Sequence, residues 1–368
     1  MKNKILILLI SLTLLLFLAC DRFEHSFEPA GNNENSISAF FNEFADTLTT
    51  FPNIPGIMSF YHEDYSNNGQ TKADVEDFYT AFTLLNCVVF LEASLSDTSN
   101  YNITWQLLAT TAAEEVILDT TFTDVLIPAA DSYLFYGNQT EMRNVVIELF
   151  SGQWCSNCPT AEAAIYNLKQ QYGSRLSYTE YHIADQLATD ENNAVFAYYP
   201  NTGSLPFAVI NGNALLLYAA PSVESVQAEI ENAITPLLAE SPVVNISDFQ
   251  YSFSETELNG SVQIELEGDI PTDNLNLVAV LVENYNADYL NHNGEPHHNI
   301  VLKRINQELN IENLEEPVEF DITGLDALAP WYDELPADLK LVIWIQTITP
   351  SYNEQTCTVY NVIEISLE

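Results

Sequence analysis

Basic residues are scarce in this sequence. Its 368 residues include ten lysines and arginines against 52 aspartates and glutamates, which gives a formal net charge of −42. No basic residue occurs between Lys72 and Arg143. Such a surface repels nucleic acid and anionic headgroups, so we expect no nucleic-acid partner. An acidic coat of this kind favours solubility, and its charge attracts cations or basic proteins.

Several catalytic motifs are missing as well. The sequence contains no glycine-rich phosphate loop, no G-x-S-x-G nucleophile elbow, no H-E-x-x-H zinc motif and no internal repeat. Nucleotide-binding and hydrolase functions therefore have no support in the sequence. We accordingly expect no cofactor.

Long hydrophobic runs are confined to the amino terminus. Ile5–Ala19 is almost entirely apolar and follows Lys2 and Lys4, which is typical of a signal peptide and short for a membrane span. Residues 1–19 are followed by Cys20, in the order Leu-Ala-Cys-Asp, which resembles a bacterial lipoprotein signal that is cut before a lipid-carrying cysteine. On that resemblance Cys20 is lipidated. The alternative is ordinary cleavage, which would leave Cys20 as a free thiol.

A lipidated Cys20 would anchor the chain stably, because several acyl chains hold a protein to a membrane more firmly than one chain does. Residues 20–36 are polar and patternless, and we expect them to form a tether. These features predict a cell-envelope location at the outer membrane, facing either the periplasm or the cell surface. Disulfides persist in that environment. The expected partners are envelope or surface proteins, including a redox partner.

Residues 37–137 are predicted to form a mostly β domain. A short helix is indicated around Ala39–Leu48, and residues 75–136 favour strands. From Ile103 to Leu107 apolar and polar residues alternate, as in a half-buried strand. We expect an immunoglobulin-like arrangement of these strands.

Residues 138–240 change to an alternating α/β pattern. Apolar runs and helix boundary signals predict the order β-α-β-α-β-β-α, with the first strand at 145–150 and the first helix ending at Gly173. Residues 241–368 return to strand patterns, which predict an antiparallel β-sandwich of about seven strands. The expected fold class is therefore an α/β domain flanked by two β domains.

The segment GQWCSNCP follows the first of these α/β strands and contains Cys155 and Cys158. A C-x-x-C pair serves as a redox couple, as half of a metal site or as a structural staple. Its position at a helix start in this element order resembles the thioredoxin fold. Two further features share the resemblance, namely Trp154 before the first cysteine and Pro206 at the start of the third strand. The resemblance implies that Pro206 is cis and faces the cysteines.

The chemistry of the pair follows from its place at a helix start. Unpaired N–H groups and the helix dipole stabilise a thiolate there, so Cys155 is the expected nucleophile and Cys158 the resolving thiol. The intervening Ser156-Asn157 adds no positive charge, and we therefore expect a mildly reducing couple. Glu148 is either a buried carboxylate that moves protons to the resolving thiol or a plain strand-edge glutamate.

No metal site is expected. A structural zinc site needs four ligands, and Cys87 and Cys357 fall in other predicted domains without a close cysteine neighbour. Asn291–His298 combines three histidines with a carboxylate, a set that suits a transition metal, but we expect a polar hairpin loop at His297. The loop from Asp64 begins like a calcium loop but has valine where the twelfth position needs an acid. Metal binding at these two loops stays open.

A wider resemblance covers the mature chain. Glu148–Pro159 resembles the E-x-F-T-G-x-x-C-x-N-C-P segment of the outer-membrane-protein-28-related family, with Ser151 in place of threonine. Tyr181–Ala184 and His298–Arg304 resemble two other segments of that family. The resemblance implies an envelope lipoprotein with a thioredoxin-like domain and a C-terminal β domain, and it leaves the activity undefined.

Two functions follow from these observations. The first is a lipid-anchored thiol–disulfide oxidoreductase. The second is a non-enzymatic binding or assembly lipoprotein in which the Cys155–Cys158 disulfide is structural. A solvent-exposed Cys155 beside a cis Pro206 favours the first, and burial of Cys155 under a neighbouring β domain favours the second.

Overall fold

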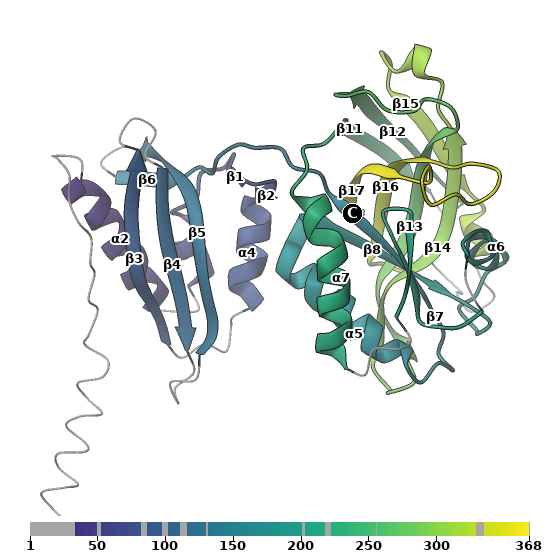
Figure 1. Cartoon of the computed structure of the whole chain (residues 1–368), viewed down its shortest axis with the longest axis horizontal. Coiled ribbons are helices and arrows are strands. Elements are labelled where there is room, and N and C mark those ends of the chain that lie inside the picture. The colour runs from purple at the N-terminus through teal and green to yellow at the C-terminus, as the bar shows by residue number, and fades with distance from the viewer. Residues whose placement is uncertain are drawn as a thin grey trace, which may run out of the picture. The chain divides into compact units, whose positions relative to one another are not determined.

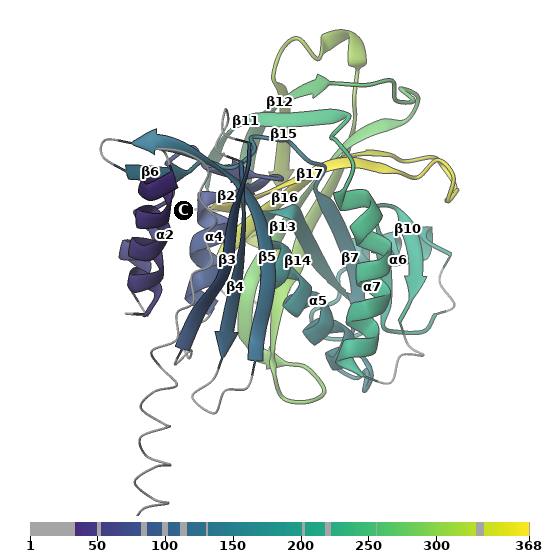
Figure 2. The same cartoon turned by 60° about the vertical axis from the view of Figure 1, so that its left-hand side comes forward.

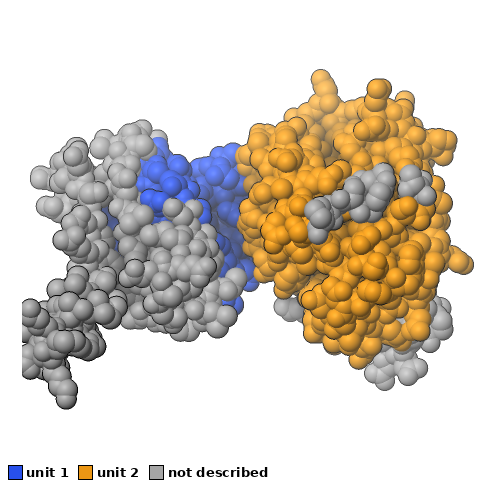
Figure 3. All heavy atoms as spheres, turned by 60° about the horizontal axis from the view of Figure 1, so that its bottom comes forward, with its two compact units in different colours: residues 1–140 blue, residues 141–368 orange. Residues whose placement is uncertain are grey.

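The structure is a computed structural model of the chain. It describes residues 34–49, 53–81, 87–97, 102–110, 116–129, 132–200, 203–217, 222–254, 256–328 and 335–367. The chain divides into two compact units, which Figure 3 colours blue (unit 1, residues 1–140) and orange (unit 2, residues 141–368). Cys20 and the expected signal segment lie outside the described residues, so their roles stay predictions. In the described part of the chain, no helix is long and apolar enough to cross a membrane.

Unit 1 contains an antiparallel sheet whose strands follow one another in chain order (Figure 1). The strands are β3 (Cys87–Asp97), β4 (Asn102–Thr110), β5 (Val116–Ala129) and β6 (Ser132–Phe135). The helices are α2 (Glu34–Thr49), α3 (Ile54–Met58) and α4 (Lys72–Ala81), and a small hairpin joins β1 (Ser66–Asn67) to β2 (Gln70–Thr71). Helix α2 confirms the helix expected around residues 39–48.

The core of unit 1 is aromatic and lies between these helices and the sheet. Phe44 of α2 packs edge-on against Trp105 of β4 and Phe135 of β6, with ring centroids 5.9 Å and 5.1 Å apart. Along β4, Ile103, Trp105 and Leu107 are buried and alternate with half-buried neighbours, which confirms the predicted alternation.

Two expectations for unit 1 are corrected. The layer that covers the described sheet is made of helices, so the immunoglobulin-like sandwich expected in residues 37–137 is not found there. The first residues of the predicted strand region are helical, because Thr71 and Asp74 start α4 with a reciprocal cap. The Asp74 carboxylate accepts from the Thr71 amide at 2.7 Å, and the Thr71 hydroxyl accepts from the Asp74 amide at 3.4 Å.

Unit 2 begins with the predicted order β-α-β-α-β-β-α. Its elements are β7 (Val145–Ser151), α5 (Cys158–Tyr172), a 3₁₀ turn (Gly173–Arg175), β8 (Leu176–His182), α6 (Asp190–Tyr198), β9 (Phe207–Ile210), β10 (Asn213–Leu216) and α7 (Val223–Leu238). The strand order is β10-β9-β7-β8, with β7 parallel to β8 and antiparallel to β9. Strands β7 and β8 are buried along their whole length, as expected of central strands covered on both faces.

The rest of unit 2 consists mainly of strands, as predicted. They are β11 (Val244–Phe253), β12 (Glu257–Leu266), β13 (Leu275–Leu290), β14 (Pro296–Glu308), β15 (Val318–Thr323), β16 (Leu339–Thr347) and β17 (Val359–Leu367), with 3₁₀ turns at Ile311–Asn313 and Leu325–Ala327. Strands β11, β12 and β15 form one antiparallel sheet. A buried apolar cluster, with Val262, Phe320 and Leu281 among its members, lies between it and strands β13, β14, β16 and β17.

The domain boundary expected at residues 240/241 does not separate two compact units. Strand β14 runs parallel to β8 and pairs with it through Ile300 and Glu180. One mixed sheet therefore runs through unit 2 in the order β10-β9-β7-β8-β14-β13-β16-β17. Helices α5 and α7 lie side by side on one face of its first half (Figure 1 and Figure 2), and α6 packs on the other face.

Candidate functional site

Cys155 and Cys158 form a disulfide at the junction between β7 and α5. Their Cα atoms are 5.4 Å apart, and Cys158 is the first residue of the helix. The Cys155 amide donates to the Gly152 carbonyl at 2.8 Å, which closes the turn after β7. The pair is therefore a covalent link across the helix start, on the side where backbone N–H groups are unpaired.

The disulfide has little contact with solvent. Cys155 is 5% exposed and Cys158 is fully buried. Both pack in one apolar cluster with Leu205 and Phe207, the neighbours of Pro206, and the Leu205–Pro206 peptide bond is cis. The structure thus contains the cis proline that the thioredoxin resemblance implies, together with a buried first cysteine.

Trp154 is an exposed residue beside the pair. Its side chain is 55% exposed, yet its indole N–H donates to the Ile183 carbonyl at 3.0 Å. The indole nitrogen lies close to Gly152, where an added Cβ would be 3.0 Å from it. A glycine at that position therefore lets the indole fold back over the turn that holds the cysteines.

Glu148 is buried and paired, so it is not a plain strand-edge glutamate. It lies in the central strand β7, is 1% exposed and forms an ion pair with Arg304 of β14. Its other oxygen accepts from the Tyr199 hydroxyl at 2.6 Å. Because side chains alternate along a strand, Glu148 shares the face of Phe150, which packs in the cluster of the cysteines.

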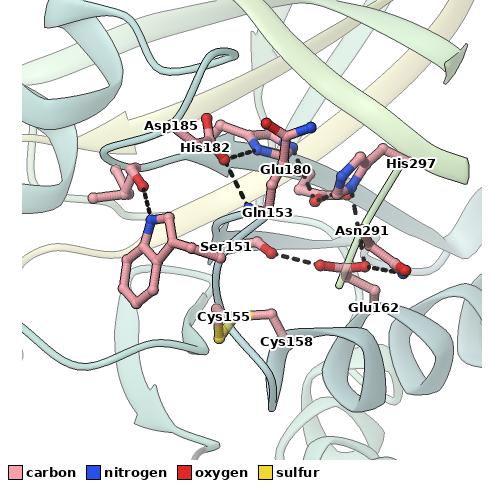
Figure 4. The surroundings of a disulfide bond; sticks show 12 residues. Ser151, Gln153, Cys155, Cys158, Glu162, Glu180, His182, Asp185, Asn291 and His297 are labelled. Atoms are coloured by element: carbon pink, nitrogen blue, oxygen red, sulfur yellow. Dashed lines mark hydrogen bonds and ion pairs between the residues drawn. A yellow bond between two sulfur atoms is a disulfide. The ribbon is translucent and has the colours of Figure 1, made fainter. Parts of the chain in front are cut away.

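Five ionisable side chains that are buried or nearly buried lie near the disulfide (Figure 4). We call them the Glu–His cluster, and its members are Glu162 of α5, Glu180 and His182 of β8, Asp185 after β8, and His297 of β14. The sequence patterns single out none of the first four, and they predict a polar loop at His297. Ser151, the last residue of β7, contacts the cluster through its hydroxyl, which donates to Glu162 Oε1 at 2.5 Å.

Short contacts connect the cluster through Glu180. Its Oε1 lies 3.1 Å from His182 Nε2 and 2.9 Å from His297 Nδ1. His182 Nδ1 is 2.7 Å from Asp185 Oδ2, and His297 Nδ1 is 3.9 Å from Glu162 Oε2. Both histidine side chains are fully buried, and the Glu180 side chain is 2% exposed.

Burial and charge shift the pKa values of this cluster in different directions. Desolvation raises the pKa of Glu162 to about 7, and the Glu180 charge adds to that rise. Desolvation also acts on Glu180, but the charge of His297 and hydrogen bonds from both histidines lower its pKa to about 2. For His182, burial is outweighed by its bonds to Asp185 and Glu180, which raise its pKa to about 10. The cluster therefore favours an ionised Glu180 beside a protonated His182.

The sequence carried only a weak signal for this cluster. Glu180 and His182 are two residues apart in β8, a spacing that places both on one face of a strand. His297 follows the predicted hairpin turn between β13 and β14, which the pairing of Leu290 with Pro296 confirms. It reaches Glu180 only because β14 pairs with β8.

The other loop with metal-binding residues is a small hairpin. Asp64 precedes β1, and its side chain is 81% exposed. Asp74 and Glu76 flank Val75, the position that lacks an acid, and the Asp74 carboxylate accepts from Thr71 instead. Within the described residues, the group of ligand-type side chains that could hold a metal is Glu180, His182 and His297.

The chain matches no protein-family model and no curated protein. Two solved structures are similar to it in part. HBP35 of Porphyromonas gingivalis is 17% identical, with a TM-score of 0.49 over 62% of this chain and 76% of that chain. A structural-genomics protein from Agrobacterium tumefaciens is 16% identical, with a TM-score of 0.41 over 61% of this chain and 95% of that chain. Similarity of this degree assigns neither family nor function, so the family named above stays a resemblance.

Proposed function

We propose that this chain is a lipid-anchored envelope protein whose Cys155–Cys158 pair exchanges disulfides with other proteins. The observation that carries the proposal is the closed disulfide at the first turn of α5, directly after a buried central strand. The N–H groups of that turn stabilise a thiolate at the first cysteine, which is the reactive species in disulfide exchange.

The element order and strand order support a thioredoxin-like domain around the pair. In the order β10-β9-β7-β8, the first two strands of the segment lie parallel and central, and the last two form an antiparallel hairpin on one side. On that resemblance Pro206 aligns the backbone of the substrate. The exposed Trp154 offers an apolar surface next to the cysteines for a substrate chain.

The proposed exchange moves two electrons to a substrate disulfide. The Cys155 thiolate attacks one substrate sulfur, the substrate S–S bond breaks, and the other substrate sulfur leaves as a thiolate. Cys158 then gives its proton to Glu148, the buried carboxylate on this face of β7, and its thiolate attacks the Cys155 sulfur. The second substrate sulfur leaves, and an external dithiol later reduces the Cys155–Cys158 disulfide.

One observation favours the second function. Cys155 is 5% exposed and packs in an apolar cluster with residues of the C-terminal strands, including Val280 and Trp344. A disulfide that reagents reach only slowly acts as a structural link. On this alternative the chain is a surface binding or assembly lipoprotein, and the pair stabilises the start of α5.

The reduction potential of the pair separates the two functions. We expect the full chain, in mild detergent, to equilibrate with glutathione or dithiothreitol buffers at a potential of roughly −270 to −120 mV, the span of working oxidoreductases. Trapping of free thiols with an alkylating reagent, followed by mass spectrometry, gives the reduced fraction at each buffer ratio.

Two variants control this measurement. Cys155→Ser should remove the two-electron transition, and Cys357→Ala should leave it unchanged, because Cys357 is a buried free cysteine outside the pair. A potential below roughly −300 mV, or a pair that does not react in the folded protein, would establish the structural function instead.

The envelope location has its own test. We propose that Cys20 carries the lipid and that the chain belongs to the family it resembles. Cells fed labelled palmitate should label the wild-type chain and release Cys20→Ala into the soluble envelope fraction. Equal labelling of the two chains would contradict the anchor.

A further inference from the structure

The Glu–His cluster has an excess of buried negative charge. It holds the carboxyl groups of Glu162, Glu180 and Asp185 but no lysine or arginine, and in the described part of the chain no ion pair joins these acids to a lysine or arginine. Buried charges are costly unless a partner of opposite charge compensates them. A cation at this position would supply that compensation.

Each of the two histidine rings places one nitrogen beside Glu180, namely His182 Nε2 at 3.1 Å and His297 Nδ1 at 2.9 Å. His182 Nε2 makes no well-aligned hydrogen bond there, and His297 Nε2 is buried without a hydrogen-bond partner in the described residues. A buried polar atom without a partner is rare and destabilising. Nitrogens of this kind are the usual ligand atoms of divalent transition metals.

Asp185 orients His182 as a metal-binding histidine is normally oriented. The Asp185 carboxylate bonds His182 Nδ1 at 2.7 Å, and it is itself held by the amides of Gln153 at 2.8 Å and Leu187 at 2.9 Å. A carboxylate on one ring nitrogen fixes the tautomer and directs the other nitrogen toward the metal. Here that other nitrogen is Nε2, which faces Glu180.

We propose that Glu180, His182 and His297 bind a divalent first-row transition-metal ion such as Zn²⁺ inside unit 2. One ligand atom from each residue lies within 4.8 Å of the others. Ligand atoms on a tetrahedral Zn²⁺ at about 2.0–2.1 Å are about 3.3 Å apart. Glu180 Oε1 is 3.1 Å from His182 Nε2 and 2.9 Å from His297 Nδ1, so small side-chain shifts would complete the coordination.

A cavity gives this site a place for a fourth ligand. It has a volume of about 280 Å³, and its lining includes Glu162, Glu180, Asn291 and His297. Three protein ligands with one open position are typical of metal sites that hold a water molecule or a substrate. Glu162, fixed by Ser151 and Asn291, lines the same cavity and would accept a hydrogen bond from that fourth ligand.

The proposal does not depend on the redox function, and its test keeps the two apart. Chelator-treated full chain is titrated with Zn²⁺ by calorimetry without reductant, so that the disulfide stays closed and offers no thiolate. Physiological salt and excess Mg²⁺ occupy weak carboxylate sites on the acidic surface. We expect one tightly bound Zn²⁺ per chain.

The variants follow from the ligand set. His182→Ala and His297→Ala should each weaken Zn²⁺ binding at least 100-fold, and Asp185→Asn, which removes the carboxylate that orients His182 but no ligand, should weaken it about 10–100-fold. His292→Ala is the matched control, because this exposed histidine lies in the turn before β14 and should keep wild-type affinity.

Circular dichroism checks that each variant folds, and Glu180→Gln replaces any alanine variant that does not. Two results would overturn the proposal. One is a wild-type chain that binds no Zn²⁺ under these conditions, which would mean that protons on the histidines balance the buried carboxylates. The other is tight binding that survives both the histidine and the Glu180 substitutions.

Discussion

Asp124 is a buried carboxylate in unit 1 whose ionisation is opposed by its surroundings. It is 2% exposed, and it accepts from the Tyr65 hydroxyl at 3.0 Å and from the amides of Val125 at 2.8 Å and Gly137 at 3.1 Å. Burial outweighs these hydrogen bonds and raises its pKa to about 7. The group therefore links the stability of unit 1 to pH.

The sign of this link follows from the pKa in each state. An unfolded aspartate titrates near 3.9, well below the folded value. The stability that Asp124 contributes is therefore complete below about pH 4, and it is lost as the pH rises through about 7. Asp124→Asn should remove this loss, so relative to wild type it should gain about 2–4 kcal/mol between pH about 4 and about 8.

Hydrogen exchange of peptides from β4 and β5 measures this difference, with both chains compared at each pH so that intrinsic exchange rates cancel. Tyr61, Tyr65 and Tyr79 also face this region, but burial raises their pKa values further, so they stay protonated throughout. Asp64→Asn, at an exposed side chain of the same unit, is the control. An unchanged pH slope in Asp124→Asn would show that another group governs it.

At this scale the sequence predicted residues that belong to local motifs. Cys155, Cys158 and Pro206 stand in short segments whose spacing or resemblance marks them, and the structure contains both the disulfide and the cis bond. Glu180 and His297 are far apart in sequence and carry no shared motif. Only the pairing of β8 with β14 brings them together.

Elements with clear boundary signals were predictable. Thr189 caps α6 by accepting from the Asn192 amide at 3.0 Å, and Ser222 caps α7 by accepting from the Ser225 amide at 3.3 Å. Pro236 lacks a backbone N–H and disfavours the continuation of a helix, and α7 ends two residues later, at Leu238. The order β-α-β-α-β-β-α follows from such local signals.

Helix α4 has local helix signals of the same kind, although strands were predicted from residue 75 onward. Val75, Phe78 and Tyr79 pack toward the core of unit 1 at spacings of three and four residues, which is the helical period. Thr71 and Asp74 supply the capping pair just before them. The sequence predicted strands over residues 75–136 from apolar patterns that begin at Cys87, where β3 does start.

The domain boundary at residue 240, inside unit 2, was predicted from a change of pattern along the chain. The change from an α/β pattern to strands near residue 240 is real, but strand pairing across it is not visible in composition. Glu148 of β7 and Arg304 of β14 form a buried ion pair across that boundary. Arg143, before β7, likewise pairs with Glu240 and donates to the Val359 carbonyl of β17. The contacts that cross the boundary, Glu148 with Arg304 and Arg143 with the Val359 carbonyl, join segments that are far apart in the sequence.

Unit 2 should therefore fold only as a whole. We expect residues 141–240 produced alone to lack a cooperative unfolding transition, and residues 141–368 to show one. In the shorter chain β8 loses its neighbour β14, and nine of the nineteen buried residues in the described cluster around Cys155 are gone. Glu148 also loses Arg304, and an uncompensated buried charge costs about 3–5 kcal/mol, against a total stability of about 5–15 kcal/mol for a typical domain.

Urea unfolding followed by far-ultraviolet circular dichroism distinguishes the two chains, with residues 141–368 as the matched control. The physical argument is that central strands buried on both faces cannot become exposed edges without losing their apolar cover. If residues 141–240 unfold cooperatively with the helix and strand content seen here, the shared sheet is a docking surface between two independent domains, and the boundary predicted at residue 240 is correct after all.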